Sequence, residues 1–251
     1  MTSDLDNLRV LLVAVRNPLN IGAAARAMSN FGVKTLRVVN PYEAAFREAR
    51  SAVGAAGLLA AAPKYDCVAD AVEDCNLIVG TSAGGKRDLQ HRLLPLDQGM
   101  RLIKRQLHSG RVALLFGSER YGLSNEELSH CHWLMRIPTR EEHGSMNLGQ
   151  AVAVSLYELI RGRKAAPARS TTPKPEKIPA QSADIERLTQ VLFQVLRVSG
   201  YIEPRAVAAE EKLRRLVRRL KLNADDATVL VGMLRQTAWK LNAGEKSDKS
   251  S

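Results

Sequence analysis

Short apolar runs alternate along the chain with longer stretches in which apolar residues recur every three or four positions. The runs are rich in Val, Leu and Ile and predict strands buried on both faces, at residues 8–15, 35–39, 77–79, 112–116 and 134–137. The longer stretches predict helices at residues 20–31, 42–50, 95–107, 124–130 and 148–161. This alternation indicates an α/β fold around a parallel sheet.

The pattern changes after this region. Residues 162–182 hold four of the ten prolines among Lys, Ser, Thr and Ala, which predicts a linker. Helical spacing returns at residues 185–198, 204–220 and 224–241. We therefore expect an α/β domain over residues 1–162, a flexible linker over 163–183, a small all-helical domain over 184–242 and a disordered tail over 243–251.

Composition narrows the class of protein. A chain of 251 residues with 45% hydrophobic residues can form one α/β domain and a small second domain. No apolar run approaches the roughly 18 residues of a membrane span, and arginines flank the first run, so we predict a strand there and neither a signal peptide nor a membrane segment. Cys67, Cys75 and Cys131 form neither a CxxC pair nor a Cys/His cluster, which predicts no metal site and a reducing, cytoplasmic location.

Positive charge is concentrated in the C-terminal part of the chain, residues 161–251. The net charge of +11 divides into +9 for residues 161–251, with 19 Lys and Arg against 10 Asp and Glu, and +2 for residues 1–160, with 18 against 16. Such asymmetry indicates that this part of the chain attracts a polyanion.

Four arginines form two rows within the helix predicted at 204–220. Arg214 lies four residues before Arg218, and Arg215 lies four residues before Arg219. Like charges at this spacing repel each other unless a polyanion or an acidic neighbour lies alongside. The alternative is a solvated face of a helix that packs through its leucines, Leu213, Leu216 and Leu220.

Three distant segments combine a tight turn with polar residues. They are residues 17–28 (NPLNIGAAARAM), 115–128 (LFGSERYGLSNEEL) and 137–156 (IPTREEHGSMNLGQAVAVSL). Each follows or includes a predicted strand, so all three should meet at the carboxyl edge of one sheet, where open α/β folds bind ligands.

In the first segment, Asn17, Asn20 and Arg26 occupy a strand-to-helix turn and the start of the helix. The small residues 22–25 let this helix pack closely and keep the turn uncrowded, so that Arg26 can reach toward a ligand at the sheet edge. A surface arginine on an alanine-rich helix is the alternative.

In the second segment, Gly117, Glu119 and Gly122 follow the strand predicted at 112–116. A glycine-rich turn of this kind exposes backbone N–H groups to a ligand, and Glu119 is the carboxylate placed among them. An ordinary loop that ends in a capping box at residues 124–127 is the alternative, and it leaves the glycines and Glu119 unexplained.

In the third segment, Ile137 ends a strand, and Gly144, Ser145, Met146 and Asn147 lead into a helix. A helix N-terminus presents free backbone amides to a ligand. Capping of the helix by one of the two polar side chains is the alternative.

A polar loop of Thr81, Ser82 and Ala83 ends another predicted strand and is a weaker candidate for ligand binding, because such loops are common. We expect His143, alone in a charged loop, to be a solvated surface residue and not a base.

These segments carry a resemblance to a known family. NPLNIGAAAR, FGSERYG and SMNLGQAV resemble, in this order, the three motifs of the SPOUT, TrmH-type RNA ribose 2′-O-methyltransferases, and the resemblance covers about the first 160 residues. The remaining segment, with GYIEPR and LRRLVRRL, resembles the C-terminal extension of bacterial members that act on the anticodon loop of tRNA, although these two motifs are less specific.

The resemblance implies a deep trefoil knot, which pattern reasoning alone would not propose because knots are nearly absent from proteins. It implies a homodimer that uses S-adenosylmethionine. The residues implied to hold this cofactor are Thr81, Ser82, Ala83, Gly117, Ile137, Gly144, Ser145 and Met146. The residues implied to face the methyl acceptor are Asn20, Arg26, Glu119, Ser145 and Asn147.

The implied activity is 2′-O-methylation of a cytidine or uridine ribose in tRNA, at position 32, with tRNA bound by Arg214, Arg215, Arg218 and Arg219. A guanidinium stays protonated and is a poor base, so we expect Arg26 to orient a phosphate and stabilise the alkoxide. Another tRNA or rRNA position and a non-catalytic RNA-binding protein of the same fold are alternatives. A Rossmann-type nucleotide enzyme would need a G-x-G-x-x-G turn, which the sequence lacks.

Overall fold

The computed structural model describes residues 4–49, 54–83, 90–140, 144–161, 179–202 and 207–248, with side chains for all of them except 207 and 243–248. The chain divides into two compact units, Met1–Pro175 and Glu176–Ser251. Most of the predicted linker, residues 163–178, lies outside the described residues, and so does His143.

The first unit is built on a seven-stranded sheet in which every pairing is parallel, in the order β3-β2-β1-β6-β4-β7-β5. The strands are β1 (Leu8–Val13), β2 (Leu36–Val39), β3 (Lys64–Tyr65), β4 (Leu77–Thr81), β5 (Leu93–Pro95), β6 (Val112–Phe116) and β7 (Trp133–Arg136). The prediction of an α/β fold with a parallel sheet is confirmed. β3 (KY) and β5 (LLP) were not predicted, because two and three residues that include a Lys and a Pro do not form an apolar run.

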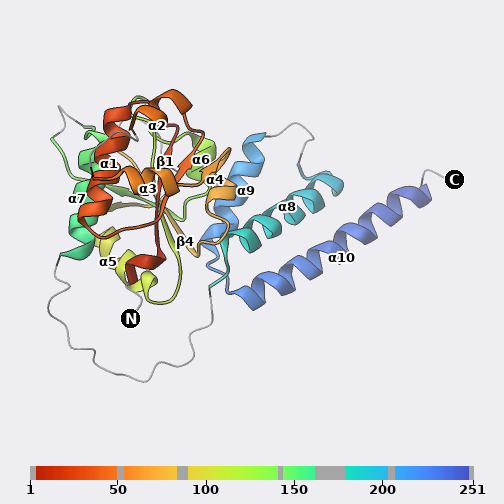
Figure 1. Cartoon of the computed structure of the whole chain (residues 1–251). Helices are drawn as coiled ribbons and strands as arrows, with labels where there is room; N and C mark the ends of the chain where they lie inside the picture. The colour runs from red at the N-terminus through yellow and green to blue at the C-terminus, as the bar shows by residue number, and fades with distance from the viewer. Residues whose placement is uncertain are drawn as a thin grey trace, which may run out of the picture. The chain divides into compact units, whose positions relative to one another are not determined.

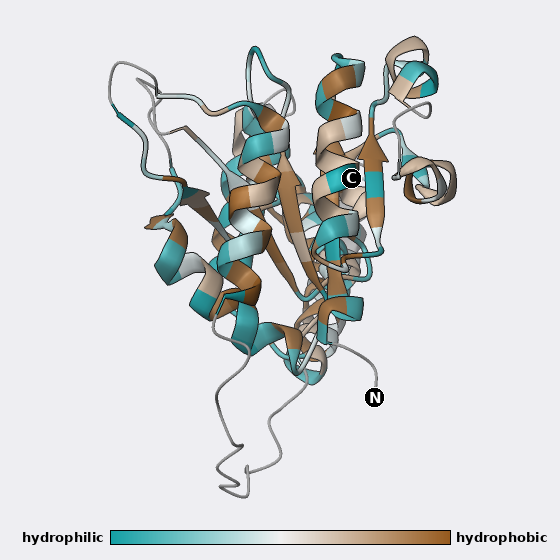
Figure 2. Cartoon of the chain, turned by 60° about the vertical axis from the view of Figure 1, so that its left-hand side comes forward, coloured by the Kyte–Doolittle hydropathy of each residue, from teal (hydrophilic) through white to brown (hydrophobic). Residues whose placement is uncertain are grey.

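Helices cover both faces of this sheet (Figure 1). They are η1 (Asp4–Asn7), α1 (Pro18–Asn30), α2 (Glu43–Ala49), α3 (Ala56–Ala61), α4 (Val68–Ala71), α5 (Leu96–Leu107), α6 (Asn125–Ser129) and α7 (Leu148–Ile160). The sequence did not predict α3 and α4, which have only six and four residues. The strand side chains alternate between two cores: in β1, Val10 and Leu12 pack with α1, α5 and α7, whereas Leu11 packs with α4 and α6. Figure 2 shows the strands as the hydrophobic centre of the unit.

β7 enters the sheet between β4 and β5, although both of these strands precede it in the chain. Met135 pairs with Thr81 on one side and with Leu94 on the other. As a result, the carboxyl ends of β1, β6, β4 and β7 are consecutive along one edge of the sheet. The three segments identified in the sequence all depart from this edge.

The second unit contains α8 (Ser182–Val198), α9 (Val207–Arg219) and α10 (Ala224–Asp248). Ile185 and Leu188 of α8 pack with Val217 of α9 and with Val231 of α10 in a small core. α10 continues past residue 241, so the backbone of residues 243–248 is helical where a disordered tail was predicted. That stretch is polar and gave no periodic signal. Among the residues that the structure describes, no helix is both long and apolar enough to cross a membrane.

Candidate functional site

A cavity of about 490 Å³ opens at the carboxyl edge of the sheet. Its walls come from the residues that follow β4, β6 and β7 and from the first turns of α1 and α7. The predicted site residues that line it are Asn20, Thr81, Ser82, Ala83, Gly117, Glu119, Ile137, Gly144, Ser145, Met146 and Asn147. The structure thus brings together residues from all three segments and from the loop after β4.

A chain of hydrogen bonds joins the three segments at one side of the cavity. Asn147 Nδ2 donates to Asn20 Oδ1 over 2.8 Å, and Asn20 Nδ2 donates to Glu119 Oε1 over 2.9 Å. The backbone N–H groups of Arg16 and Asn17 donate to the same carboxylate over 3.4 and 3.3 Å. Asn20 is only 8% exposed. The loops after β1, β6 and β7 are therefore fixed relative to one another by polar contacts.

Glu119 also lies beside the N-terminus of α1, where the helix dipole favours a negative charge. The Asn17 side chain caps this helix by accepting a hydrogen bond of 2.9 Å from the N–H of Leu19. Because its carboxylate already accepts three hydrogen bonds, Glu119 is better placed to orient Asn20 than to act as a free proton acceptor.

The loop after β6 folds into a tight hairpin. Ser118 and Gly122 exchange backbone hydrogen bonds of 3.2 and 2.8 Å, and Gly122 has a φ of +67°. A Cβ on Gly117 would overlap the backbone of Gly122, so this close approach requires glycine. The hairpin presents Arg120 and Tyr121 at the rim of the cavity.

The third segment both caps a helix and joins the network. Asn147 Oδ1 accepts a hydrogen bond of 3.3 Å from the N–H of Gln150, so the capping alternative is correct for this residue, while its Nδ2 contacts Asn20. A Cβ on Gly149 would lie 2.5 Å from the Cβ of Ala23. Small residues on both helices thus allow α1 and α7 to approach closely enough for the two asparagines to meet.

Sequence reasoning missed the apolar wall of the cavity. The wall consists of Phe116, Leu123, Leu128, Met135 and Leu148. Their pattern marks them as core residues, and periodicity does not reveal that one side of a core is open. The structure also adds the rim residues Ser118, Arg120, Tyr121 and Thr139, for which proximity to a motif was the only signal.

Arg26 does not belong to the lining of its own chain's cavity. It is exposed, on the same helical stripe as Leu19 and Ala23, and its guanidinium lies against Gly54, where a Cβ would overlap it. Nine residues after the cap at Asn17, the helix has risen roughly 13 Å along its axis. Arg26 therefore does not enter the cavity of its own chain, and its role toward a ligand at the sheet edge stays a prediction.

In the second unit, acidic side chains lie alongside one of the two cationic rows of α9, which is one of the two possibilities that the sequence left open. Arg214 and Arg218 are 7% and 2% exposed. Both pair with Glu186 of α8, at 3.0 and 3.6 Å, and Arg214 pairs further with Glu210 at 2.9 Å. Arg218 also donates a hydrogen bond of 3.2 Å to Ser182. These arginines belong to the interior of the unit.

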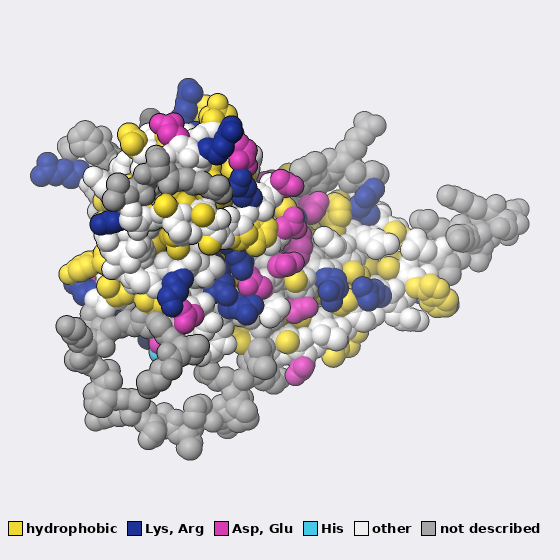
Figure 3. Space-filling model, in the orientation of Figure 1, with side chains coloured by type: hydrophobic (Ala, Val, Ile, Leu, Met, Phe, Trp, Pro, Cys, Tyr) yellow, Lys and Arg dark blue, Asp and Glu magenta, His cyan; other side chains and the backbone are white. Residues whose placement is uncertain are grey.

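The other row lies nearer the surface. Arg219 is exposed, and Arg215 pairs with Glu211 at 3.6 Å. Leu216 and Leu220 are 46% and 55% exposed, whereas Leu213 is 7% exposed, so of the three leucines in the alternative only Leu213 packs in the interior. On the face drawn in Figure 3, Lys and Arg side chains are mixed with Asp and Glu on both units.

A separate charge cluster lies at the opposite, amino edge of the sheet. Asp74 accepts hydrogen bonds of 2.6 and 2.9 Å from Arg37 and of 3.2 Å from Arg111, and Arg9 lies 3.7 Å away. Burial alone would raise the pKa of Asp74, but its hydrogen bonds and the charge of Arg37 lower it to about 2. Burial raises the pKa of the Cys75 thiol to about 12, so this thiol is a packing group. Among the described residues, no His, Cys, Asp and Glu side chains gather to hold a metal ion.

The cavity at the carboxyl edge of the parallel sheet is therefore walled by three motifs that lie far apart in the sequence. Residues 7–157 match the model of the SpoU rRNA Methylase family, and the chain belongs to that family. The matched range includes every residue of the hydrogen-bonded network. The family resemblance stated from the sequence is confirmed.

Individual relatives agree along nearly the whole chain. The tRNA (cytidine/uridine-2′-O-)-methyltransferase TrmJ of Pectobacterium atrosepticum is 37% identical over 233 residues, which cover 92% of this chain and 96% of the relative. TrmJ of Cronobacter sakazakii is 36% identical over 235 residues, covering 92% and 95%. The crystal structure of TrmJ from Z. mobilis ZM4 superposes with a TM-score of 0.74 at 30% identity, covering 91% of this chain and 97% of that one.

Proposed function

We propose that this chain is an S-adenosylmethionine-dependent tRNA (ribose-2′-O-)-methyltransferase that acts on the cytidine or uridine at position 32 of the anticodon loop. The observation that carries the proposal is the Asn147–Asn20–Glu119 network, which joins three family motifs at one cavity. Relatives named as tRNA cytidine/uridine 2′-O-methyltransferases match the chain over 92% of its length.

The cavity fits the proposed cofactor. Its volume of about 490 Å³ lies within the usual range of about 300–1,000 Å³ for small-molecule sites. The apolar wall suits an adenine ring, and the loops at Thr81–Ala83, Gly117, Ile137 and Gly144–Met146 offer backbone groups to the ribose and the amino-acid end. When bound, this cofactor supplies a methyl group carried by a positively charged sulfur.

The acceptor ribose belongs beside the polar side of the cavity. A 2′-hydroxyl is a poor nucleophile, so the site must stabilise the developing oxyanion or accept its proton. Ser145 is exposed on the cavity wall and can hydrogen-bond to the ribose. Asn20, held on both sides by Glu119 and Asn147, keeps the loops rigid, and alignment of the hydroxyl in a rigid site lowers the barrier.

The active form is a homodimer in which Arg26 serves the partner's cavity. α1 packs against α7, and the two helices present adjoining exposed stripes that include Leu19 and Ala23 on α1 and Val154 and Tyr157 on α7. Leu19 and Tyr157 are 79% and 55% exposed. A second copy on this surface would bury these apolar side chains and bring Arg26 to the interface.

In the partner's site, Arg26 orients an RNA phosphate and stabilises the alkoxide. The planar guanidinium matches the geometry of a phosphate and holds it through two parallel hydrogen bonds. The proton of the hydroxyl leaves through phosphate or water.

The second unit contributes tRNA binding through cations at its surface. Because Arg214 and Arg218 are buried, this role falls to the exposed side chains of α9 and its end, Lys212, Arg219 and Lys221. Exposed cations bind phosphates by releasing counterions. A tRNA substrate places the enzyme in the cytoplasm.

The sheet order supports the trefoil knot. β7 lies between β4 and β5, and the chain continues from β7 into α7, which packs in the core against α1. In the proposed knot, the chain that leaves β7 threads under an earlier loop before it forms α7.

The test is a methylation assay with purified protein, a labelled methyl donor and unmodified tRNA, followed by mapping of 2′-O-methyl groups. We expect a single product at position 32, which should be absent from tRNA of a strain that lacks the gene. Methylation elsewhere would correct the position. Cofactor-independent tRNA binding without any methylation would instead identify a non-catalytic RNA-binding protein.

A further inference from the structure

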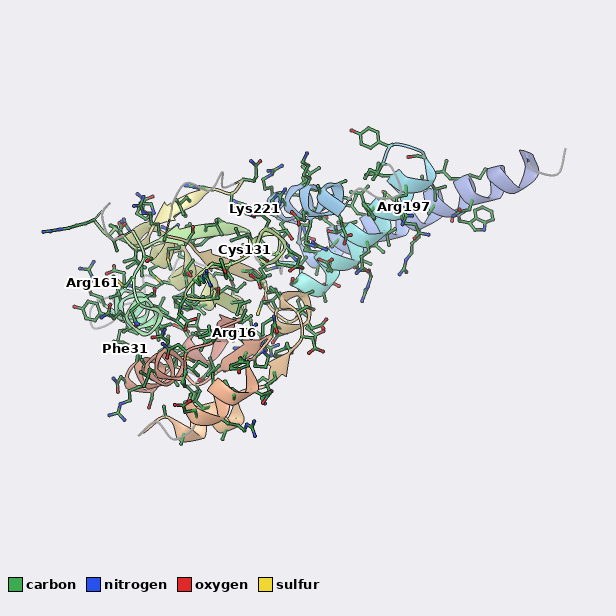
Figure 4. The ribbon with its side chains drawn as sticks, turned by 90° about the horizontal axis from the view of Figure 1, so that it is seen from above. Arg16, Phe31, Cys131, Arg161, Arg197 and Lys221 are labelled. Carbon is green, nitrogen blue, oxygen red and sulfur yellow. The ribbon has the colours of Figure 1, made fainter. Side chains whose placement is uncertain are left out.

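Two exposed tyrosines each have an arginine over the ring: Tyr121 lies two residues from Glu119, and Tyr42 is connected to Glu119 through Arg16. The Arg16 guanidinium is 5.4 Å from the ring centre of Tyr42, and that of Arg120 is 5.1 Å from the ring centre of Tyr121. Tyr42 is 50% exposed and Tyr121 69% exposed. The backbone N–H of Arg16 donates to the Glu119 carboxylate, so both pairs adjoin the network that faces the acceptor. Arg16 is labelled in Figure 4.

The strand order places the two pairs in a row. Tyr42 follows β2, Arg16 follows β1, and Tyr121 follows β6, and these strands are neighbours in the sheet. Two strand spacings, roughly 10 Å, therefore separate the points from which the two tyrosines depart. The cofactor loops follow β6, β4 and β7, so the row extends the cavity on its acceptor side.

Both rings stand on well-held backbone. The N–H of Tyr121 donates to Ser118 Oγ over 3.2 Å within the tight hairpin. The carbonyl of Tyr42 accepts a hydrogen bond of 3.1 Å from the N–H of Phe46, which is 1% exposed in the core. Because the backbone beneath each ring is already held, it loses little freedom when a ligand stacks on the ring.

A third arginine–tyrosine pair shows what a structural pair looks like in this protein. Arg37 lies 5.9 Å from the ring centre of Tyr65, but it is held by Asp74, and Tyr65 is half-buried. In the Arg16–Tyr42 and Arg120–Tyr121 pairs, the described contacts include no carboxylate that holds the arginine side chain. Their rings are exposed to solvent at the edge of the site.

We propose that Tyr42 and Tyr121 stack on two unpaired bases of the RNA, the base of the methylated nucleotide and one of its neighbours, while Arg16 and Arg120 contact the adjoining phosphates. Proteins recognise single-stranded RNA loops by stacking splayed bases on aromatic rings and arginine planes. The inference rests on the proposed RNA methyltransferase function and adds the residues that position the loop.

The test measures binding of full-length protein to an anticodon stem–loop RNA in which the target base, or a base on either side of it, is replaced by an abasic nucleotide. Wild-type protein should bind two of these RNAs about tenfold more weakly than the intact RNA. Tyr121→Leu should bind the intact RNA about tenfold more weakly than the wild-type protein. It should bind one abasic RNA, the one that lacks the base stacked on Tyr121, no more weakly than it binds the intact RNA. Tyr42→Leu should show the same behaviour with the RNA that lacks the base stacked on Tyr42. Tyr→Phe at either position should restore binding to within twofold, since the ring is kept.

Tyr201→Leu is the matched control, because Tyr201 is 81% exposed and lies in the second unit. Any loss of RNA-binding free energy caused by Tyr201→Leu should add fully to the loss caused by each abasic substitution. Fully additive losses for Tyr42→Leu and Tyr121→Leu would overturn the stacking proposal even if the wild-type protein methylates tRNA. Coupling without methylation would support stacking and contradict the enzymatic function instead, whereas absence of RNA binding would contradict both.

Discussion

Asn147 donates a 2.8 Å hydrogen bond to Asn20, a residue 127 positions earlier in the chain. The bond connects the start of α7 to the start of α1 and continues to Glu119 in the hairpin after β6. The three motifs, which are far apart in the sequence, are therefore connected as one group. A substitution in any of them should alter the positions of the other two.

Asn20→Ala should lower both stability and activity. The substitution removes two hydrogen bonds of a buried amide, one of them to a charged carboxylate, which lowers the free energy of unfolding by about 1–3 kcal/mol. Methyl transfer should fall at least tenfold, because the loops lose their alignment. Urea unfolding and single-turnover methylation measure the two effects. Asn30→Ala, at the exposed end of the same helix, is the control, and equal effects of both substitutions would contradict a role for the network.

Arg26→Ala should nearly abolish methyl transfer and leave cofactor affinity within a few-fold, because Arg26 does not line the cofactor cavity of its own chain. Arg26→Lys should restore little, since an ammonium group lacks the planar fork. Single-turnover methylation and cofactor titration of both variants provide the test. Loss of cofactor binding with unchanged chemistry would reverse the assigned role.

Mixing inactive variants distinguishes action within a chain from action across the dimer. Arg26→Ala subunits mixed with Glu119→Ala subunits should recover activity, because each mixed dimer then contains one site with both residues intact. With random exchange, about a quarter of wild-type activity should return. No recovery from a mixture that demonstrably exchanges subunits would place Arg26 in its own chain's site.

The two arginine rows of α9 should differ in their effects. Arg214→Gln with Arg218→Gln removes the buried partners of Glu186 and should destabilise the second unit by about 3–5 kcal/mol. Arg215→Gln with Arg219→Gln should leave stability nearly unchanged and flatten the salt dependence of tRNA binding by up to about 2 units of slope. Thermal unfolding and binding at several salt concentrations separate the two outcomes. If the salt dependence of tRNA binding were unchanged in the Arg215→Gln, Arg219→Gln variant, these two arginines would not contact the RNA.

Asp74 should make stability depend on pH in the acid range. Its folded-state pKa of about 2 lies below the ordinary value of 3.8, so its contribution is fully present above about pH 4 and is lost as the pH falls through 2. Asp74→Asn should therefore cost roughly 2 kcal/mol at pH 7 and progressively less toward pH 2. Urea unfolding across this range measures the difference. A constant difference would show that the charge of Asp74 is not its cause.

The sequence predicted the buried parallel strands and the meeting of the motifs because both depend on local pattern. Val112–Phe116 is apolar at every position, and β1 and β7, which precede the other two motifs, each contain a run of at least three apolar residues. The pattern could not show the carboxylate of Glu186 that draws Arg214 and Arg218 inward, because the partner lies on another helix.

The position of β7 within the sheet could not be predicted from the sequence either. The apolar run of β7 predicts a strand, but nothing in it specifies insertion between β4 and β5. The surface that Arg26 serves could not be predicted for a related reason: the motif gives the spacing of Arg26 from Asn20, whereas this surface depends on the direction of the whole helix.

The insertion of β7 has a consequence for synthesis on the ribosome. Among the described strands, β5 pairs with β7 alone, so it has no neighbour until about forty further residues have been made. At roughly 5–20 residues per second, the nascent chain exposes an apolar strand edge for several seconds. Protection by a chaperone during that interval would favour correct assembly, and the ability to bind a cofactor should be the last property that the emerging domain acquires.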